Sequence, residues 1–184
     1  MAETTMMLSS EQHTQCAKAL FNSVWTFLEM KDRSVDDDDL MIHTAHASLL
    51  HWHQVGTATN FARGEWQLSR VYAVLDRAEP ALHHADRCLA LCRDHDLGDF
   101  DLGFAYEAHA RAHAVAGNEA GMNRFLELAE QVGRGVDDEE DRSYLKLIPT
   151  SFTLGNSEVE NLRKAGHKLL REAPRFQQFL KEAR

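Results

Sequence analysis

The stretch that decides the fold is ARGEWQLSRVY, residues 62–72, because its pattern returns 41 residues later as GFAYEAHARAH, residues 103–113. Three positions in each stretch have the spacing i, i+3, i+7, which places their side chains on one face of a helix. These positions are Arg63, Trp66 and Arg70 in the first stretch and Phe104, Glu107 and Arg111 in the second. A short turn and another helix are expected after each stretch. A chain that repeats such a unit is typically a stack of helical hairpins, and such stacks usually serve recognition.

Composition favours one helical domain. The chain has 184 residues, of which 43% are hydrophobic, with only 3 prolines and 10 glycines. This length suits a single domain with a substantial core. Stretches rich in alanine, leucine and glutamate favour helices, and no convincing strand pattern occurs. The expected fold class is therefore all-α.

Apolar periodicity and turn residues divide this domain into three parts. They are an N-terminal helical pair (residues 10–56), two hairpins (57–135) and C-terminal capping helices (136–184). The acidic run Asp36 to Asp39 suits the start of the second helix, where unpaired backbone N–H groups favour negative charge. We expect about seven to nine helices, at about 10–30, 36–54, 57–75, 80–92, 99–116 and 122–133, then near 137, over 158–172 and after Pro174.

Charge and cysteine content exclude several classes of protein. The formal net charge is −9, so a phosphate backbone would be repelled and no nucleic-acid partner is expected. No segment reaches the ~20 apolar residues of a membrane span, and the first residues lack the features of a secretory signal. The 3 cysteines form no Cys-x-x-Cys pair, which fits a reduced cytoplasmic protein.

The two central hairpins resemble tetratricopeptide repeats, which are helix–turn–helix units that stack into a curved right-handed superhelix. The resemblance rests on an alternation of bulky and small residues. The matching positions are Leu68, Ser69, Tyr72, Ala81, Ala85 and Cys88 in the first unit and Tyr106, His109, Ala110, His113, Met122, Leu126 and Ala129 in the second. The 41-residue step exceeds the family's usual ~34, which implies longer helices or joints.

This resemblance implies a concave groove that is lined by the first helix of each hairpin and holds an extended peptide. Carried over to this chain, the groove-lining residues are Arg63, Trp66, Arg70, Phe104, Glu107 and Arg111. Arginine side chains bind carboxylates or phosphates bidentately, and aromatic rings add apolar area or a cation–π surface. Exposed ion pairs contribute only ~0–1 kcal/mol, so such charges are not needed for stability, which favours recognition. Glu107 could instead hold Arg70 or Arg111 in a structural ion pair.

The 11 histidines raise a second hypothesis, a metal or general-base site. His43, His46 and His51 could act with Glu65 or Glu107 in a pocket between the second helix and the central hairpins. No complete metal-binding motif is present, so no cofactor is expected.

Two further histidine pairs have simpler interpretations. His109 and His113 have the i, i+4 spacing of metal-binding helices, but both stand where the repeat needs packing residues. His83 and His84 are expected on the exposed side of the fourth helix.

Other catalytic signatures are absent, including a Gly-x-Ser-x-Gly elbow and a phosphate-binding loop. The favoured hypothesis is a non-enzymatic module that recognises a peptide or protein segment with an acidic or anionic group. The alternative is a small-molecule-binding protein or a metal-dependent enzyme that uses the histidine-lined pocket. As a third hypothesis, the groove is filled by the chain's own end, through Phe176, Phe179 and Leu180, or by a second copy in a homodimer.

Overall fold

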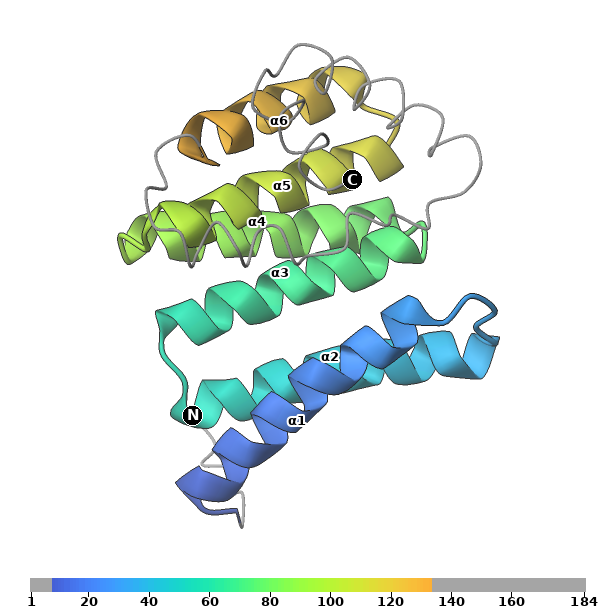
Figure 1. Cartoon of the computed structure of the whole chain (residues 1–184), viewed down its shortest axis with the longest axis vertical. Helices are drawn as coiled ribbons and strands as arrows, with labels where there is room; N and C mark the ends of the chain where they lie inside the picture. Colours follow the sequence, from blue (N-terminus) through green and yellow to red (C-terminus); the bar gives the residue numbers. More distant parts are fainter. Residues whose placement is uncertain (1–7, 134–184) are drawn as a thin grey trace, which may run out of the picture.

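The computed structural model describes residues 8–133, and all regular structure in this range is helical (Figure 1). The helices are α1 (Ser10–Glu29), α2 (Val35–Val55), α3 (Ala58–Val74), α4 (Ala78–Asp94), α5 (Asp99–Val115) and α6 (Glu119–Gly133). The all-α prediction is confirmed for this range. The helices predicted near residue 137, over 158–172 and after Pro174 lie outside the described residues. None of the six helices is long and apolar enough to cross a membrane.

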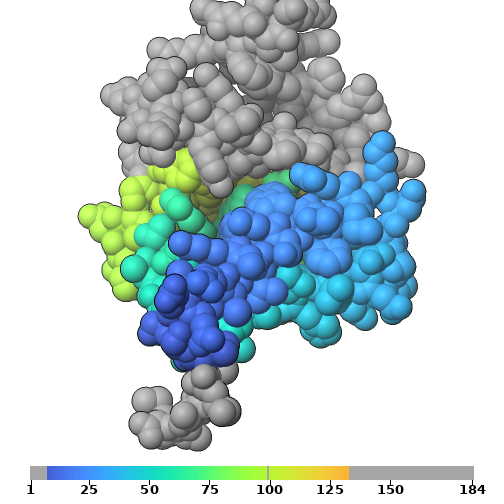
Figure 2. Space-filling model, turned by 60° about the horizontal axis from the view of Figure 1, so that its bottom comes forward, coloured from blue at the N-terminus to red at the C-terminus, as the bar shows by residue number. Residues whose placement is uncertain are grey.

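The helices pair as three antiparallel hairpins, α1 with α2, α3 with α4 and α5 with α6 (Figure 1). The hairpins stack in chain order because α2 packs on α3 and α4 packs on α5. The first helices also meet, since α3 packs directly on α5 and touches α1. Figure 2 views the stack from the end at which α1 and α2 cover the front of the molecule.

The 41-residue repeat extends from the side-chain pattern to the helix boundaries. Helix α5 begins and ends 41 residues after α3, and α6 begins 41 residues after α4. Each of α3, α4 and α5 has 17 residues. The two central hairpins are therefore built on the same plan.

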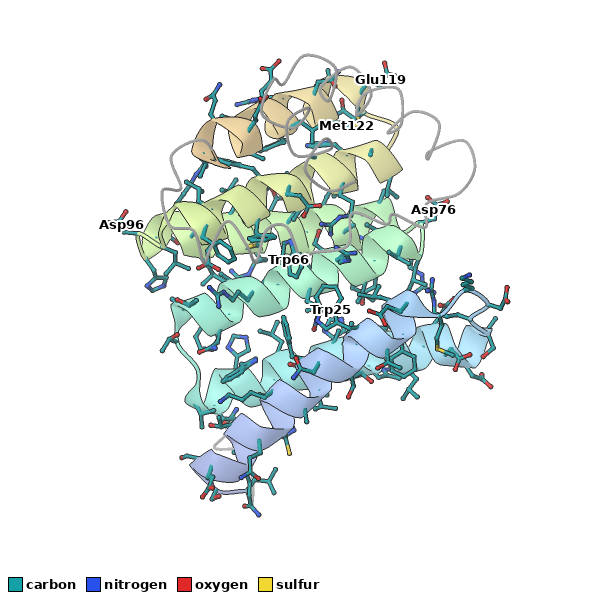
Figure 3. All side chains as sticks on the ribbon, viewed as in Figure 1. Trp25, Trp66, Asp76, Asp96, Glu119 and Met122 are labelled. Atoms are coloured by element: carbon teal, nitrogen blue, oxygen red, sulfur yellow. The ribbon has the colours of Figure 1, made fainter. Side chains whose placement is uncertain are left out.

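The turns inside these two hairpins also correspond. Asp76 and Gly117 stand 41 residues apart and both have left-handed backbone, with φ of 58° and 68° (Figure 3 labels Asp76). After each of them, a backbone N–H reaches back to the end of the preceding helix. The Arg77 N–H donates to the Tyr72 carbonyl at 2.9 Å, and the Asn118 N–H donates to the His113 carbonyl at 2.9 Å. This bond satisfies a carbonyl that a helix end leaves unpaired.

The start of α2 confirms the interpretation of the acidic run. Ser34 caps the helix, and its hydroxyl accepts from the Asp37 N–H at 3.2 Å. The Asp37 carboxylate accepts in return from the Ser34 hydroxyl at 2.6 Å and from the Ser34 N–H at 2.9 Å. These bonds from Ser34 lower the pKa of Asp37.

Helix α3 lies at the centre of the fold. Residues 64–71 are buried without interruption, because α2, α4 and α5 pack around this helix and α1 touches it. Leu68 and Val71 join a core with α1 and α2, whereas Ala62 and Trp66 join a second core with α4 and α5. A helix that is enclosed in this way connects all the neighbouring hairpins.

Two glycines provide a test of local packing, one at the end of α2 and one inside α5. A Cβ atom at Gly56 would lie 2.7 Å from the Trp52 carbonyl oxygen, whereas a Cβ at Gly103 would meet only Val132 at 3.9 Å. Gly56→Ala should therefore destabilise the protein by about 1–3 kcal/mol. Gly103→Ala should stabilise it by about 0.5–1 kcal/mol, because glycine is a poor residue inside a helix. Urea unfolding measures the stability of both variants, and equal effects would contradict the difference in space around the two glycines.

Candidate functional site

Equivalent positions of the two central hairpins meet at Trp66 and Glu107, which are 41 residues apart. The indole Nε1–H of Trp66 donates to Glu107 Oε2 at 3.1 Å. The same carboxylate oxygen accepts from Arg111 Nη2. The Arg111 guanidinium carbon also lies 5.9 Å from the centre of the Trp66 ring. The repeated helix face is therefore a contact surface between α3 and α5.

Arg70 and Arg111 are buried, with only 7% and 2% of their surface exposed. The Arg70 guanidinium lies 5.2 Å from the centre of the Trp25 ring, which itself packs 5.9 Å from Trp66 (Figure 3 labels both tryptophans). Burial, and then the charge of Arg111, lower the pKa of Arg70 to about 10, and Glu107 opposes this effect. These two arginines are therefore buried, so the small stability contribution of exposed ion pairs does not describe them.

A cavity of about 120 Å³ lies beside this contact. Three of the six predicted groove residues line it, namely Arg63, Trp66 and Phe104. The other lining residues were not predicted to line a groove; they are Phe21 from α1, Ala62 from α3, Cys88 from α4, and Phe100 and Asp101 from α5. Trp66 thus belongs both to the cavity wall and to the contact with Glu107.

The polar part of the cavity wall is an ion pair between α3 and α5. Arg63 donates from Nε to Asp101 Oδ1 at 2.7 Å and from Nη2 to Oδ2 at 3.2 Å. The Arg63 side chain is 51% exposed, whereas that of Asp101 is 13% exposed. The Arg63 guanidinium carbon also lies 5.6 Å from the centre of the Phe100 ring. Arg63 is therefore the predicted groove arginine that solvent reaches.

Two of these lining residues, Phe21 and Asp101, have sequence positions that suggest other roles. Phe21 belongs to the apolar stripe of α1, which predicted a core position. Asp101 stands near the start of α5, where aspartate commonly caps a helix. In the structure Gly98 is the capping residue, so Asp101 is the third residue of the helix and pairs with Arg63.

The histidines of α2 separate into two groups. His46 Nε2 lies 2.9 Å from the Tyr72 hydroxyl, and His51 Nδ1 lies 2.9 Å from His13 Nδ1. Within residues 8–133, no three side chains of histidine, cysteine, aspartate or glutamate are placed to hold a metal ion. In this part of the chain, His43, His46 and His51 thus belong to no three-residue metal cluster.

The prediction that His84 lies on the surface is wrong. Its side chain is only 12% exposed, and its Nδ1 lies 2.6 Å from Glu65 Oε2. The His84 ring stacks on Tyr72, with ring centres 5.5 Å apart and planes 2° apart. His83 is exposed as predicted. Only the packing of α4 on α3 brings His84 to Glu65, so helix periodicity could not reveal this contact.

His109 is a packing residue, as the sequence indicated. It is 3% exposed, and its ring stacks on Phe125 with centres 4.3 Å apart. His113 lies on the same side of Phe125, at 5.4 Å. The i, i+4 pair thus joins α5 to α6.

In comparisons with known proteins, no protein-family model, no curated protein and no solved structure gives a significant match to this chain. The function is therefore inferred from the geometry of the site.

The Trp66–Glu107 bond should contribute measurably to stability. Hydrogen bonds to a charged group typically contribute about 1.5–3 kcal/mol. Trp66→Phe, Glu107→Gln and the double variant form a cycle that isolates the coupling between the two side chains. We expect a coupling energy of about 1 kcal/mol or more from urea unfolding. Independent, additive effects would show that α3 and α5 do not meet at this pair.

Acidification should destabilise the junction of α2 with α3 and α4. Burial is the main cause that lowers the pKa of His46, and the charges of His84 and His43 lower it as well. The charge of Glu65 opposes this shift. The unfolded chain therefore binds a proton at this position more readily, so stability falls as the pH drops below about 6.5. The urea midpoint should fall less between pH 7.5 and 5.5 in His46→Gln than in the native chain. His95 is exposed, so His95→Gln serves as the control. If the urea midpoint of His46→Gln falls as much as that of the native chain, His46 does not cause the loss of stability in acid.

Proposed function

We propose that this chain is a recognition module that binds a peptide or protein segment with an acidic group. In this proposal the hairpins form a tetratricopeptide-like right-handed superhelix, and their first helices line the binding groove. The Trp66–Glu107 contact is the observation that carries the proposal. It joins equivalent positions of two successive hairpins, as expected where the first helices of a repeat share one inner face.

The cavity beside this contact supports the proposal, because a bound segment needs a place for an apolar side chain. It measures about 120 Å³, and Trp66 and Phe104 form part of its wall. Apolar pockets with a few convergent polar groups are the usual form of a binding site. An anchoring side chain in a desolvated pocket typically supplies much of the binding energy.

The proposal gives the predicted groove residues different roles. Arg63 is half-exposed at the cavity, where Asp101 binds it, and a carboxylate of the partner would share or replace that contact. Arg70 and Arg111 are buried against tryptophan rings, so they position the groove wall. Reversing the charge of either buried arginine would place a carboxylate in the protein interior and is expected to disturb folding. Arg63 is therefore the residue to change in a binding test.

A phage-displayed library of random peptides tests this function without a known partner. We expect the selected peptides to combine acidic residues with a bulky apolar residue. Arg63→Glu should weaken their binding at least about tenfold, which corresponds to about 1.4 kcal/mol. Fluorescence titration measures the affinities, and circular dichroism checks the helix content of each variant.

Lys31→Glu makes the same reversal of charge at an exposed site. Lys31 lies in the α1–α2 joint, at the opposite end of the hairpins from the start of α3 (Figure 1). Its peptide affinity should stay within about twofold of the native value. Failure to select any peptide, or equal binding by Arg63→Glu, would rule out the proposed groove.

A further inference from the structure

The cavity walls are unusually rich in aromatic rings. Phe21, Trp66, Phe100 and Phe104 all line a space of about 120 Å³. The Trp66 and Phe104 rings are 5.3 Å apart and inclined by 76°, and the Phe100 and Phe104 rings are 4.8 Å apart and inclined by 66°. Neighbouring rings thus stand nearly at right angles, as the adjoining walls of a box do.

This box has two charged groups, the Asp101 carboxylate and the Arg63 guanidinium that is paired with it, and the carboxylate can attract a cation. The Asp101 carboxylate lines the same space and is largely shielded from solvent. The protein's own Arg63 already takes the position of a bound cation, since it pairs with Asp101 and lies 5.6 Å from the centre of the Phe100 ring. Aromatic faces attract cations through the negative potential of their π-electrons. The box therefore carries both features that hold an organic cation, namely aromatic faces and a carboxylate.

The size of the cavity narrows the class of ligand. It is slightly smaller than a cavity of about 150 Å³ that accommodates benzene. A compact group with a weakly hydrated positive charge fits such a space, because it loses little hydration on entering an apolar box. A trimethylammonium group has these properties, whereas a primary ammonium group is strongly hydrated.

We propose that Phe21, Trp66, Phe100, Phe104 and Asp101 form an aromatic cage that binds a quaternary ammonium group. Such cages are the known means by which proteins recognise choline-like ligands and methylated lysine. Arg63 competes with the ligand for Asp101 and for the face of Phe100. A small ligand can occupy the cage without a peptide in the groove, so this site can exist whether or not peptides are captured.

Choline and its uncharged isostere 3,3-dimethylbutan-1-ol test the cage directly, since they have the same shape and differ in charge. Isothermal titration calorimetry on the full chain should show that choline binds at least about tenfold more tightly than the uncharged isostere, which corresponds to about 1.4 kcal/mol. An amide of trimethyllysine, compared with unmodified lysine amide, distinguishes a side-chain ligand from a free one. Tighter binding of trimethyllysine than of choline would assign the cage to a modified peptide.

Two variants separate the cage from a merely apolar cavity. Asp101→Asn should weaken choline binding and leave the affinity for the uncharged isostere unchanged. Arg63→Gln should strengthen choline binding, because it removes the internal competitor. The proposal is overturned if neither ligand binds, if the isostere binds as tightly as choline, or if Arg63→Gln weakens choline binding in a protein with native helix content.

Discussion

The enclosure of α3 is the constraint on which the rest of this structure depends. Residues 64–71 are buried, yet they include Glu65, Gln67 and Arg70, whose polar groups need partners inside the protein. Gln67 donates to the Phe21 carbonyl of α1 at 2.9 Å, and Glu65 meets His84 of α4. The buried polar groups of α3 thus fix where neighbouring helices can lie, in addition to the apolar contacts that hold them there.

Trp66 shows how this constraint produces a site. One edge of its ring donates to Glu107 of α5, and the ring also packs between Trp25 and Phe104. A side chain held on several sides cannot collapse into the neighbouring space. The part of the cavity wall that Trp66 forms is therefore held by contacts with Glu107, Trp25 and Phe104, as expected of a pre-formed binding pocket.

The sequence predicted the fold more completely than the site. The spacing of Trp66 and Glu107 identified a shared helix face, and the same 41-residue step recurs in the helix boundaries and turns. Periodicity shows which face of a helix is buried, but not which neighbour covers it. Phe21 and Asp101 reach the cavity from α1 and α5, and the burial of Arg111 depends on packing of several helices. These features follow from tertiary contacts, which a single sequence does not display.

The central claim is that α3 is the enclosed helix around which the hairpins assemble, and native-state hydrogen exchange of backbone amides tests it most directly. Amides that exchange only on global unfolding report the most stable part of a fold. The structure predicts that the amides of residues 64–71 exchange most slowly among the described helices, with α1 and α6 opening earlier. Fast exchange in residues 64–71, at the rate of α1 or α6, would contradict the account.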